Sequence, residues 1–151
     1  MALLSKGMWV VVADGEKAMI LENAGSTAAP RLVVLDKFEQ ELEANRDMGT
    51  DRPGRMPDPG QSQLSAMEPT DYQRLAKERF IGQLADRVNA LAAREKGRRI
   101  VLAAPPQSLA VLRDGLSKPA LEAVIAELPK TLTQHPLDKI GKLVAQDIDK
   151  I

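Results

Sequence analysis

The chain has 151 residues, the size of one domain with a single hydrophobic core. It contains no cysteine, which excludes a disulfide framework and a thiolate metal site. Lys plus Arg and Asp plus Glu both number 21, so the chain lacks the overall positive charge of a free-standing nucleic-acid binder. Aromatic residues make up only 3% of the chain, which argues against a platform of stacked rings for single-stranded nucleic acid.

The first part of the chain predicts an antiparallel meander. Residues 8–13 (MWVVVA) form a continuous run typical of a strand that is buried on both faces. Asp14-Gly15 separates this run from a second one at 17–22, and an Asp-Gly pair in that place predicts a hairpin with a type I′ turn. Residues 31–38 (RLVVLDKF) predict a third strand. We therefore expect three strands before the first helix.

Residues 44–69 are the part of the chain least suited to regular structure, because they contain four prolines and several glycines. A loop of this length is uncommon in a compact domain, and it is usually functional or disordered. The sequence therefore predicts one domain over 1–151 with a long Pro/Gly-rich loop at 44–69.

A long amphipathic helix is expected after this loop. Thr70 and Gln73 have the spacing of a capping box, and Gly97 predicts the end of the helix. The apolar residues at helical spacing are Tyr72, Leu75, Ala76, Phe80, Leu84, Val88, Leu91 and Ala92. We expect this face to lie on the sheet.

The remaining chain alternates strands and helices. Residues 98–104 predict a buried strand that Pro105-Pro106 ends, since proline cannot continue a ladder. Ser108 is expected to cap a short helix at 109–116, and a helical turn is expected to begin at 117–119. Residues 123–128 fit either a helix or a strand, and we favour a strand. Thr133 is expected to cap the last helix.

The predicted order is β-β-β, long loop, α-β-α-β-α. Strands separated by helices imply parallel pairing through right-handed crossovers. We therefore expect an α/β fold whose mixed sheet of about five strands begins as an antiparallel meander, with helices on its faces.

Four motifs, in this order, resemble those of the bacterial host attachment protein family. They are Trp9-Val-Val-Val-Ala-Asp-Gly15, Asp51-Arg-Pro-Gly-Arg55, Ala104-Pro-Pro106 followed by Leu112-Arg113, and Lys130-Thr-Leu-Thr133. One position departs from the pattern: Thr131 stands where the family commonly has an aspartate. That family is similar to the middle domain of archaeal and eukaryotic peptide-chain release factors. The resemblance therefore implies a five-stranded mixed sheet with flanking helices.

The same resemblance raises a catalytic hypothesis. In release factors, a Gly-Gly-Gln loop between the third strand and the long helix promotes hydrolysis of peptidyl-tRNA. Here the loop contains Pro59-Gly60-Gln61, where Gln61 would position a water molecule. Proline fixes φ near −65°, so Pro59 changes the geometry that a first glycine would give. The alternative is a solvent-exposed loop.

Arginines suggest a different function. Arg52 and Arg55 flank the rigid turn around Pro53-Gly54, and guanidinium pairs can bind phosphate bidentately. The alternative is that Asp51 pairs with these arginines to fix the loop. The full set of candidate anion- or RNA-binding residues is Arg46, Arg52, Arg55, Arg98, Arg99 and Arg113.

Several other conspicuous residues are expected to shape turns, loops and strand ends. Asp14 and Gly15 are expected to be turn residues, and Pro105 and Pro106 to end a strand at the carboxyl edge, where α/β sheets place ligands. Asp51 and Gly54 are expected to shape the loop. The single histidine, His135, is expected in a loop or cap, so with no cysteine we expect no metal site.

We therefore expect a non-enzymatic binding module that contacts RNA, with the ribosome or tRNA as partner, and no cofactor. A peptidyl-tRNA hydrolase using Gln61 and an intracellular protein-interaction factor remain open alternatives. No leader peptide or membrane-spanning stretch is recognisable, which predicts a cytoplasmic protein. Oligomeric state stays open, with a homodimer through an edge strand among the options.

Overall fold

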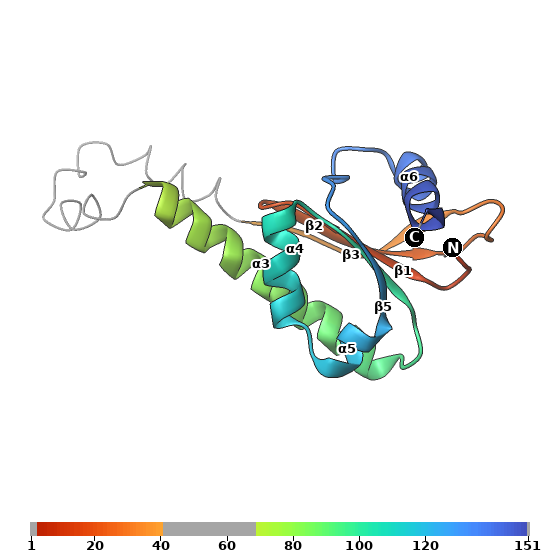
Figure 1. Cartoon of the computed structure of the whole chain (residues 1–151), viewed down its shortest axis with the longest axis horizontal. Helices are drawn as coiled ribbons and strands as arrows, with labels where there is room; N and C mark the ends of the chain where they lie inside the picture. Colours follow the sequence, from red (N-terminus) through yellow and green to blue (C-terminus); the bar gives the residue numbers. More distant parts are fainter. Residues whose placement is uncertain (1–2, 41–68, 151) are drawn as a thin grey trace, which may run out of the picture.

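The computed structural model describes residues 3–40 and 69–150, and it contains one five-stranded sheet (Figure 1). The strands are β1 (Trp9–Ala13), β2 (Lys17–Asn23), β3 (Leu32–Glu39), β4 (Ile100–Ala103) and β5 (Val124–Leu128). Their order is β3-β2-β1-β4-β5, antiparallel from β3 to β1 and parallel from β1 to β5. The predicted mixed sheet is therefore confirmed, including the strand at 123–128.

Helices cover both faces of this sheet. They are α3 (Pro69–Arg94), α4 (Pro106–Gly115), α5 (Lys118–Ala123) and α6 (Leu137–Asp149). Side chains of α3, α4 and α5 share one buried cluster with the sheet, while α6 contributes to a second cluster on the opposite face. Among the described residues, no helix is long and apolar enough to cross a membrane.

The central strand β1 explains why the fold needs both layers. All five of its residues are buried. Trp9, Val11 and Ala13 belong to the cluster under α3, whereas Val10 and Val12 belong to the cluster under α6. Because side chains alternate along a strand, a continuous apolar run requires cover on both faces.

The predicted hairpin between β1 and β2 is confirmed, but the predicted type I′ turn is wrong. A type I′ turn needs positive φ at both central residues, and neither Asp14 nor Gly15 has it. Instead, Asp14 Oδ1 accepts hydrogen bonds from the backbone N–H groups of Glu16 and Lys17, at 2.7 Å each. The aspartate side chain therefore shapes the turn.

Strand β3 contains a bulge. Ile20 faces Asp36 and Leu21 faces Val34, so Leu35 is an extra residue with no partner on β2. The bulge changes which face later residues occupy. Leu32 joins the cluster under α6, whereas Phe38 packs against the cluster under α3. Arg87 of α3 then forms an ion pair with Asp36 at 2.7 Å and lies over the Phe38 ring.

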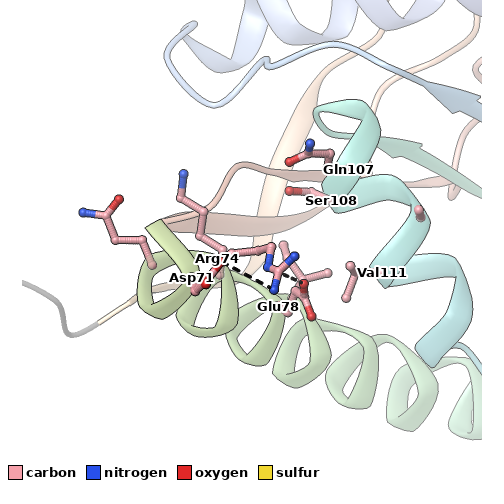
Figure 2. Close-up of a pocket in the computed structure, with 10 residues that line it drawn as sticks. Asp71, Arg74, Glu78, Gln107, Ser108 and Val111 are labelled. Atoms are coloured by element: carbon pink, nitrogen blue, oxygen red, sulfur yellow. Dashed lines mark ion pairs between the residues drawn. The ribbon is translucent and has the colours of Figure 1, made fainter. Parts of the chain in front are cut away.

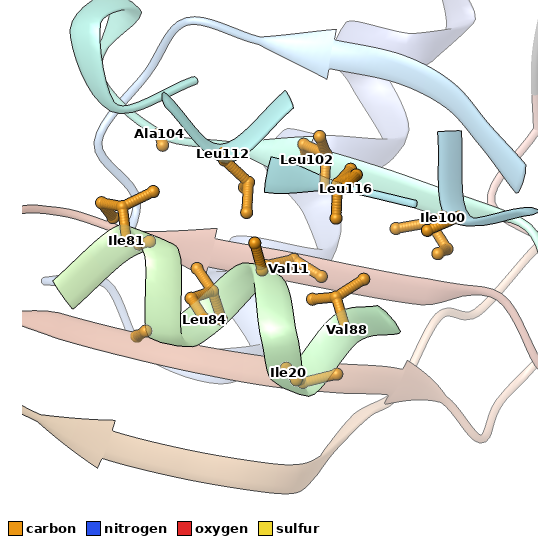
Figure 3. Packing of buried hydrophobic residues seen from close by; sticks show 14 of the residues in the cluster. Val11, Ile20, Ile81, Leu84, Val88, Ile100, Leu102, Ala104, Leu112 and Leu116 are labelled. Carbon is orange, nitrogen blue, oxygen red and sulfur yellow. The ribbon is translucent and has the colours of Figure 1, made fainter. Parts of the chain in front are cut away.

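Helix α3 packs on the sheet through its second half (Figure 3). Phe80, Leu84 and Val88 are buried as predicted, together with Ile81 and Ala85. Tyr72 and Leu75 were expected on the same face, but they are 55% and 40% exposed. The helix begins at Pro69, so Thr70 lies inside it rather than at the predicted cap position.

Two further predicted caps are wrong. Pro105 is the cap residue of α4, and Ser108 lies in its first turn without a capping hydrogen bond. Proline at the start of a helix costs no hydrogen bond, so a serine cap is not required there. Likewise, α6 begins after Pro136, while the Thr133 hydroxyl donates to Asp14. The helical turn expected from 117–119 is present as α5, and Ser117 caps it by accepting from Ala120 N.

Candidate functional site

The predicted loop sites lie outside the described residues. They are Arg46, Asp51, Arg52, Gly54, Arg55 and Gln61. Their roles in anion binding, loop shape and catalysis therefore stay predictions. The remaining candidates can be placed, and they fall at different ends of the parallel strands.

Arg98 and Arg99 lie at the amino edge of the sheet, where β1 and β4 begin. Trp9 pairs with Ile100 across these two strands, and Trp9 N donates to Arg99 O at 2.9 Å. This pairing places the residues just before β4 beside those just before β1. The two segments are far apart in sequence, yet they form one surface.

A hollow of about 380 Å³ lies between these segments. Its lining residues are Ser5, Lys6, Gly7, Met8, Gly97, Arg98 and Arg99. We call this the amino-edge hollow. Three of the seven residues are cationic, so the hollow is suited to an anion.

Arg98 is held by neighbours within the protein. Its Nη1 donates to the Gly7 carbonyl at 2.8 Å, and its Nη2 donates to Glu95 Oε1 at 2.9 Å. Glu22 Oε1 lies 3.6 Å from Nη1, and the guanidinium lies over the Trp9 ring. Two carboxylates therefore offset the charge of Arg98, and each of its terminal nitrogens already donates a hydrogen bond within the protein.

Arg99, Lys6 and Lys96 differ from Arg98 because all three are exposed. No carboxylate in residues 3–40 or 69–150 forms an ion pair with any of them. Their charges are therefore not offset by the described acids. Arg99 and Lys6 also line the hollow, which makes them the residues best placed to contact an anion.

Arg113 does not join this group. It lies on α4 and forms an ion pair with Glu127 of β5, with Nη1 at 3.0 Å from Oε1. Glu127 faces Leu102, which lies further along β4 than the Arg99 end. The structure thus leaves Arg98 and Arg99 at the amino edge, while Arg113 lies on α4 and is paired with an acid.

The carboxyl edge, where ligands usually bind in such sheets, is occupied by internal contacts. Asp14 accepts from Thr133 and from the turn backbone. The Lys77 side chain lies on Gly15, where an added Cβ would meet Lys77 Cδ at 2.7 Å. Gln40 Nε2 donates to the carbonyls of Gly15 and Ala76 at 2.9 and 3.3 Å. These contacts support the structural interpretation of Asp14 and Gly15.

A second hollow lies between the first turns of α3 and the start of α4, with a volume of about 520 Å³ (Figure 2). Its charged residues largely pair with one another: Arg74 lies 3.8 Å from Asp71 and 3.9 Å from Glu78. Ile81 and Val111 supply apolar lining. Nearly balanced charge makes this hollow a weaker anion site than the amino-edge hollow.

Metal chemistry has no support in the described ranges, where no group of three His, Asp or Glu side chains converges. His135 lies in the loop before α6, as predicted, and its backbone N–H donates to Leu132 O at 3.1 Å.

One known protein family matches most of the chain. A model of the bacterial archaeo-eukaryotic release factor family 12 matches residues 7–144. The chain belongs to this family. The resemblance to release factors inferred from the Ala104-Pro-Pro106 and related motifs is therefore confirmed, and the five-stranded sheet agrees with it. A search among curated proteins finds no match.

Lys6 was not among the residues predicted from the sequence. It is a single lysine near the start, far from the basic run at 94–99, and nothing in the sequence marks it as special. Its place beside Arg99 follows from the pairing of β1 with β4. A sequence-based prediction that β1 and β4 pair in parallel would have placed Lys6 next to Arg99.

Proposed function

We propose that this release-factor-family protein is a non-enzymatic module that binds the phosphate backbone of RNA, in the ribosome or tRNA. One observation supports the proposal most: in a chain with no net charge, exposed cations without acidic partners among the described residues gather around one hollow at the amino edge. Membership of a release factor family favours a translation-related RNA as the partner.

The chemistry of the amino edge fits a backbone ligand better than a base-specific one. Guanidinium and ammonium groups bind phosphate oxygens through charge-assisted hydrogen bonds, which carry no sequence information by themselves. The described surface supplies Arg99 and Lys96 for this purpose. With so few contacts the affinity is expected to be modest and strongly dependent on salt.

The proposal is tested by measuring the affinity of the purified protein for labelled tRNA and for ribosomes across a salt series. Arg99→Ala is expected to weaken binding about fivefold and to lower the slope of log affinity against log salt by about one. Arg79→Ala is the matched control, because Arg79 is an exposed arginine on α3 that does not line the amino-edge hollow. Equal affinities for Arg99→Ala and the wild type would contradict the proposal.

The predicted loop arginines enter the same assay. Arg52→Ala combined with Arg55→Ala is expected to abolish co-sedimentation with ribosomes, and unchanged co-sedimentation would contradict a role for the loop in binding. Release of labelled peptide from peptidyl-tRNA, lost in Gln61→Ala, would replace the binding module with the hydrolase alternative. Absence of such release in the wild type is the expected result.

A further inference from the structure

The segment before β1 is built into the fold. We call residues 3–8 the amino-terminal strap. Leu4 is only 1% exposed and belongs to the buried cluster under α6. Met8 is buried in the same cluster, and its sulfur accepts a hydrogen bond from Ser5 N at 3.0 Å. The strap is therefore anchored at both ends, while Lys6 between them is exposed.

Asn23, the last residue of β2, holds the strap through hydrogen bonds to its backbone. It is the one buried polar residue among those described, with no exposed surface. Its Nδ2 donates to the carbonyls of Leu4 at 3.1 Å and Ser5 at 3.3 Å. Its backbone carbonyl accepts from Gly7 N at 2.8 Å. A buried amide with its donors used in this way holds the backbone on both sides of Lys6.

Arg98 holds the strap through a hydrogen bond to the Gly7 carbonyl. Gly7 has φ +88°, a conformation that side chains disfavour, and an added Cβ would lie 2.8 Å from Arg98 Nη1. The missing side chain lets the guanidinium reach the Gly7 carbonyl. Glu95 and Glu22 hold the guanidinium on its other sides. Arg98 therefore connects the strap, β2 and the turn before β4.

We propose that the strap is part of the RNA site, with Lys6 as a phosphate-binding residue and Arg98 as the positioning residue that places it. This inference rests on the proposed function. Lys6 and Arg99 line the same hollow from two separate segments. The family match begins at residue 7, so Lys6 lies outside the matched range and is assigned from the structure alone.

The ligand class follows from the charges. Arg98 is offset by its two carboxylates, so the ligand meets Lys6 and Arg99 as two cations on opposite segments. Two cations that border one hollow fit successive phosphates of a strand. Gly7 and Gly97, which also line it, have no side chains that would keep a backbone away. The site is therefore expected to prefer an RNA strand to a free phosphate ion.

The main test compares Lys6→Ala with Lys17→Ala, which removes an exposed lysine from the start of β2. Affinity for a labelled RNA oligonucleotide is measured across a salt series. Lys6→Ala is expected to weaken binding by roughly three- to tenfold and to lower the salt slope by about one, while Lys6→Arg keeps both near wild type. Lys17→Ala is expected to change neither.

The role of Arg98 is tested by additivity. If Arg98 acts by placing Lys6, Arg98→Ala weakens binding in the wild type but adds little in the Lys6→Ala background. Additive losses would instead make Arg98 a direct contact and overturn the positioning role. Circular dichroism checks folding, and Arg98→Lys replaces Arg98→Ala if the latter does not fold. The lysine variant is expected to bind RNA less tightly than wild type, because its single nitrogen cannot take the places of both Nη1, which bonds Gly7, and Nη2, which bonds Glu95.

The outcomes distinguish a failure of the strap site from a failure of the proposed function. Wild-type affinity in Lys6→Ala, with Arg99→Ala weakened, overturns the strap site but leaves RNA binding intact. No RNA binding by the wild type overturns both. Sodium phosphate and sodium chloride are also compared as competitors at equal ionic strength. Because Lys6 and Arg99 are proposed to bind phosphate groups, phosphate is expected to displace RNA somewhat better than chloride. Displacement at phosphate concentrations as low as that of the RNA itself would make a small anion the ligand and overturn the RNA assignment.

Discussion

The two edges of the parallel strands use their polar residues in opposite ways. At the carboxyl edge, Asp14 bonds to the turn and to Thr133, and Lys77 lies on Gly15. At the amino edge, Arg98 is similarly bound within the protein, but Lys6 and Arg99 have no acidic partner among the described residues. Open α/β sheets usually place ligands at the carboxyl edge.

The difference teaches that the usual edge is not automatically the binding edge. A polar group whose hydrogen bonds are satisfied internally gains little by turning to a ligand, because it must first lose those bonds. An exposed cation without a partner loses only its water. The comparison therefore favours the amino edge for binding and the carboxyl edge for stability, and variants at each edge can test this division.

The largest effect is expected from Asn23→Ala at the amino edge. The substitution removes the partners of Leu4 O, Gly25 N and Arg31 N; the bond to Leu4 O is buried and the other two are partly buried. We expect the free energy of unfolding to fall by about 3 kcal/mol, since buried groups left unpaired are costly. Urea denaturation measures it.

Gln83→Ala serves as the control for Asn23→Ala, because Gln83 is an exposed amide on α3, and it should leave the urea midpoint nearly unchanged. A midpoint for Asn23→Ala equal to that of the control would show that the strap is not held by this amide. The strap inference would then lose its foundation.

An intermediate effect is expected from Asp14→Ala at the carboxyl edge. The variant loses the bonds to Glu16 N, Lys17 N and the Thr133 hydroxyl. Because Asp14 is partly exposed, water replaces some of them, and we expect a loss of about 2 kcal/mol. RNA affinity at a temperature where the variant is folded should match the wild type. Weaker RNA binding would contradict the division between the edges.

The smallest effect is expected from Gly15→Ala. The added methyl meets the flexible Lys77 side chain, so the cost should be about 1 kcal/mol and should nearly vanish in a Lys77→Ala background. Gly97→Ala is the contrasting case: φ is +89° and nothing lies within 4 Å, so a similar cost should persist in any background. Thermal denaturation of these variants distinguishes crowding from backbone strain.

Strand positions were predictable because the apolar runs are long and their ends are marked. The run at 8–13 and the Pro105-Pro106 stop place β1 and β4 close to their observed bounds. The residues that form turns and helix caps were less predictable, because several nearby residues can satisfy the same free backbone N–H groups. Asp14 took the turn N–H groups, and prolines replaced Ser108 and Thr133 as cap residues.

The candidate site was predictable only in part. Arg98-Arg99 is visible as part of a basic run, but the sequence does not show that one arginine is bound internally and the other is exposed. Lys6 becomes a neighbour only through long-range strand pairing. Similarly, Tyr72 and Leu75 follow the helical period, yet whether the sheet covers those turns is decided by the tertiary fold.

The bulge at Leu35 has a consequence for how copies of the chain meet. β3 is an outer strand of the sheet, and its own Val34 and Leu35 are exposed. An edge strand that is irregular and more strongly twisted is a poor template for pairing with a strand from another molecule. The adjoining Asp36 and Lys37 add a cost, because their charges would have to lose water in such a contact. Deleting Leu35 would straighten this edge strand, and the shortened chain should form sheet-like aggregates at concentrations where the natural chain stays dispersed.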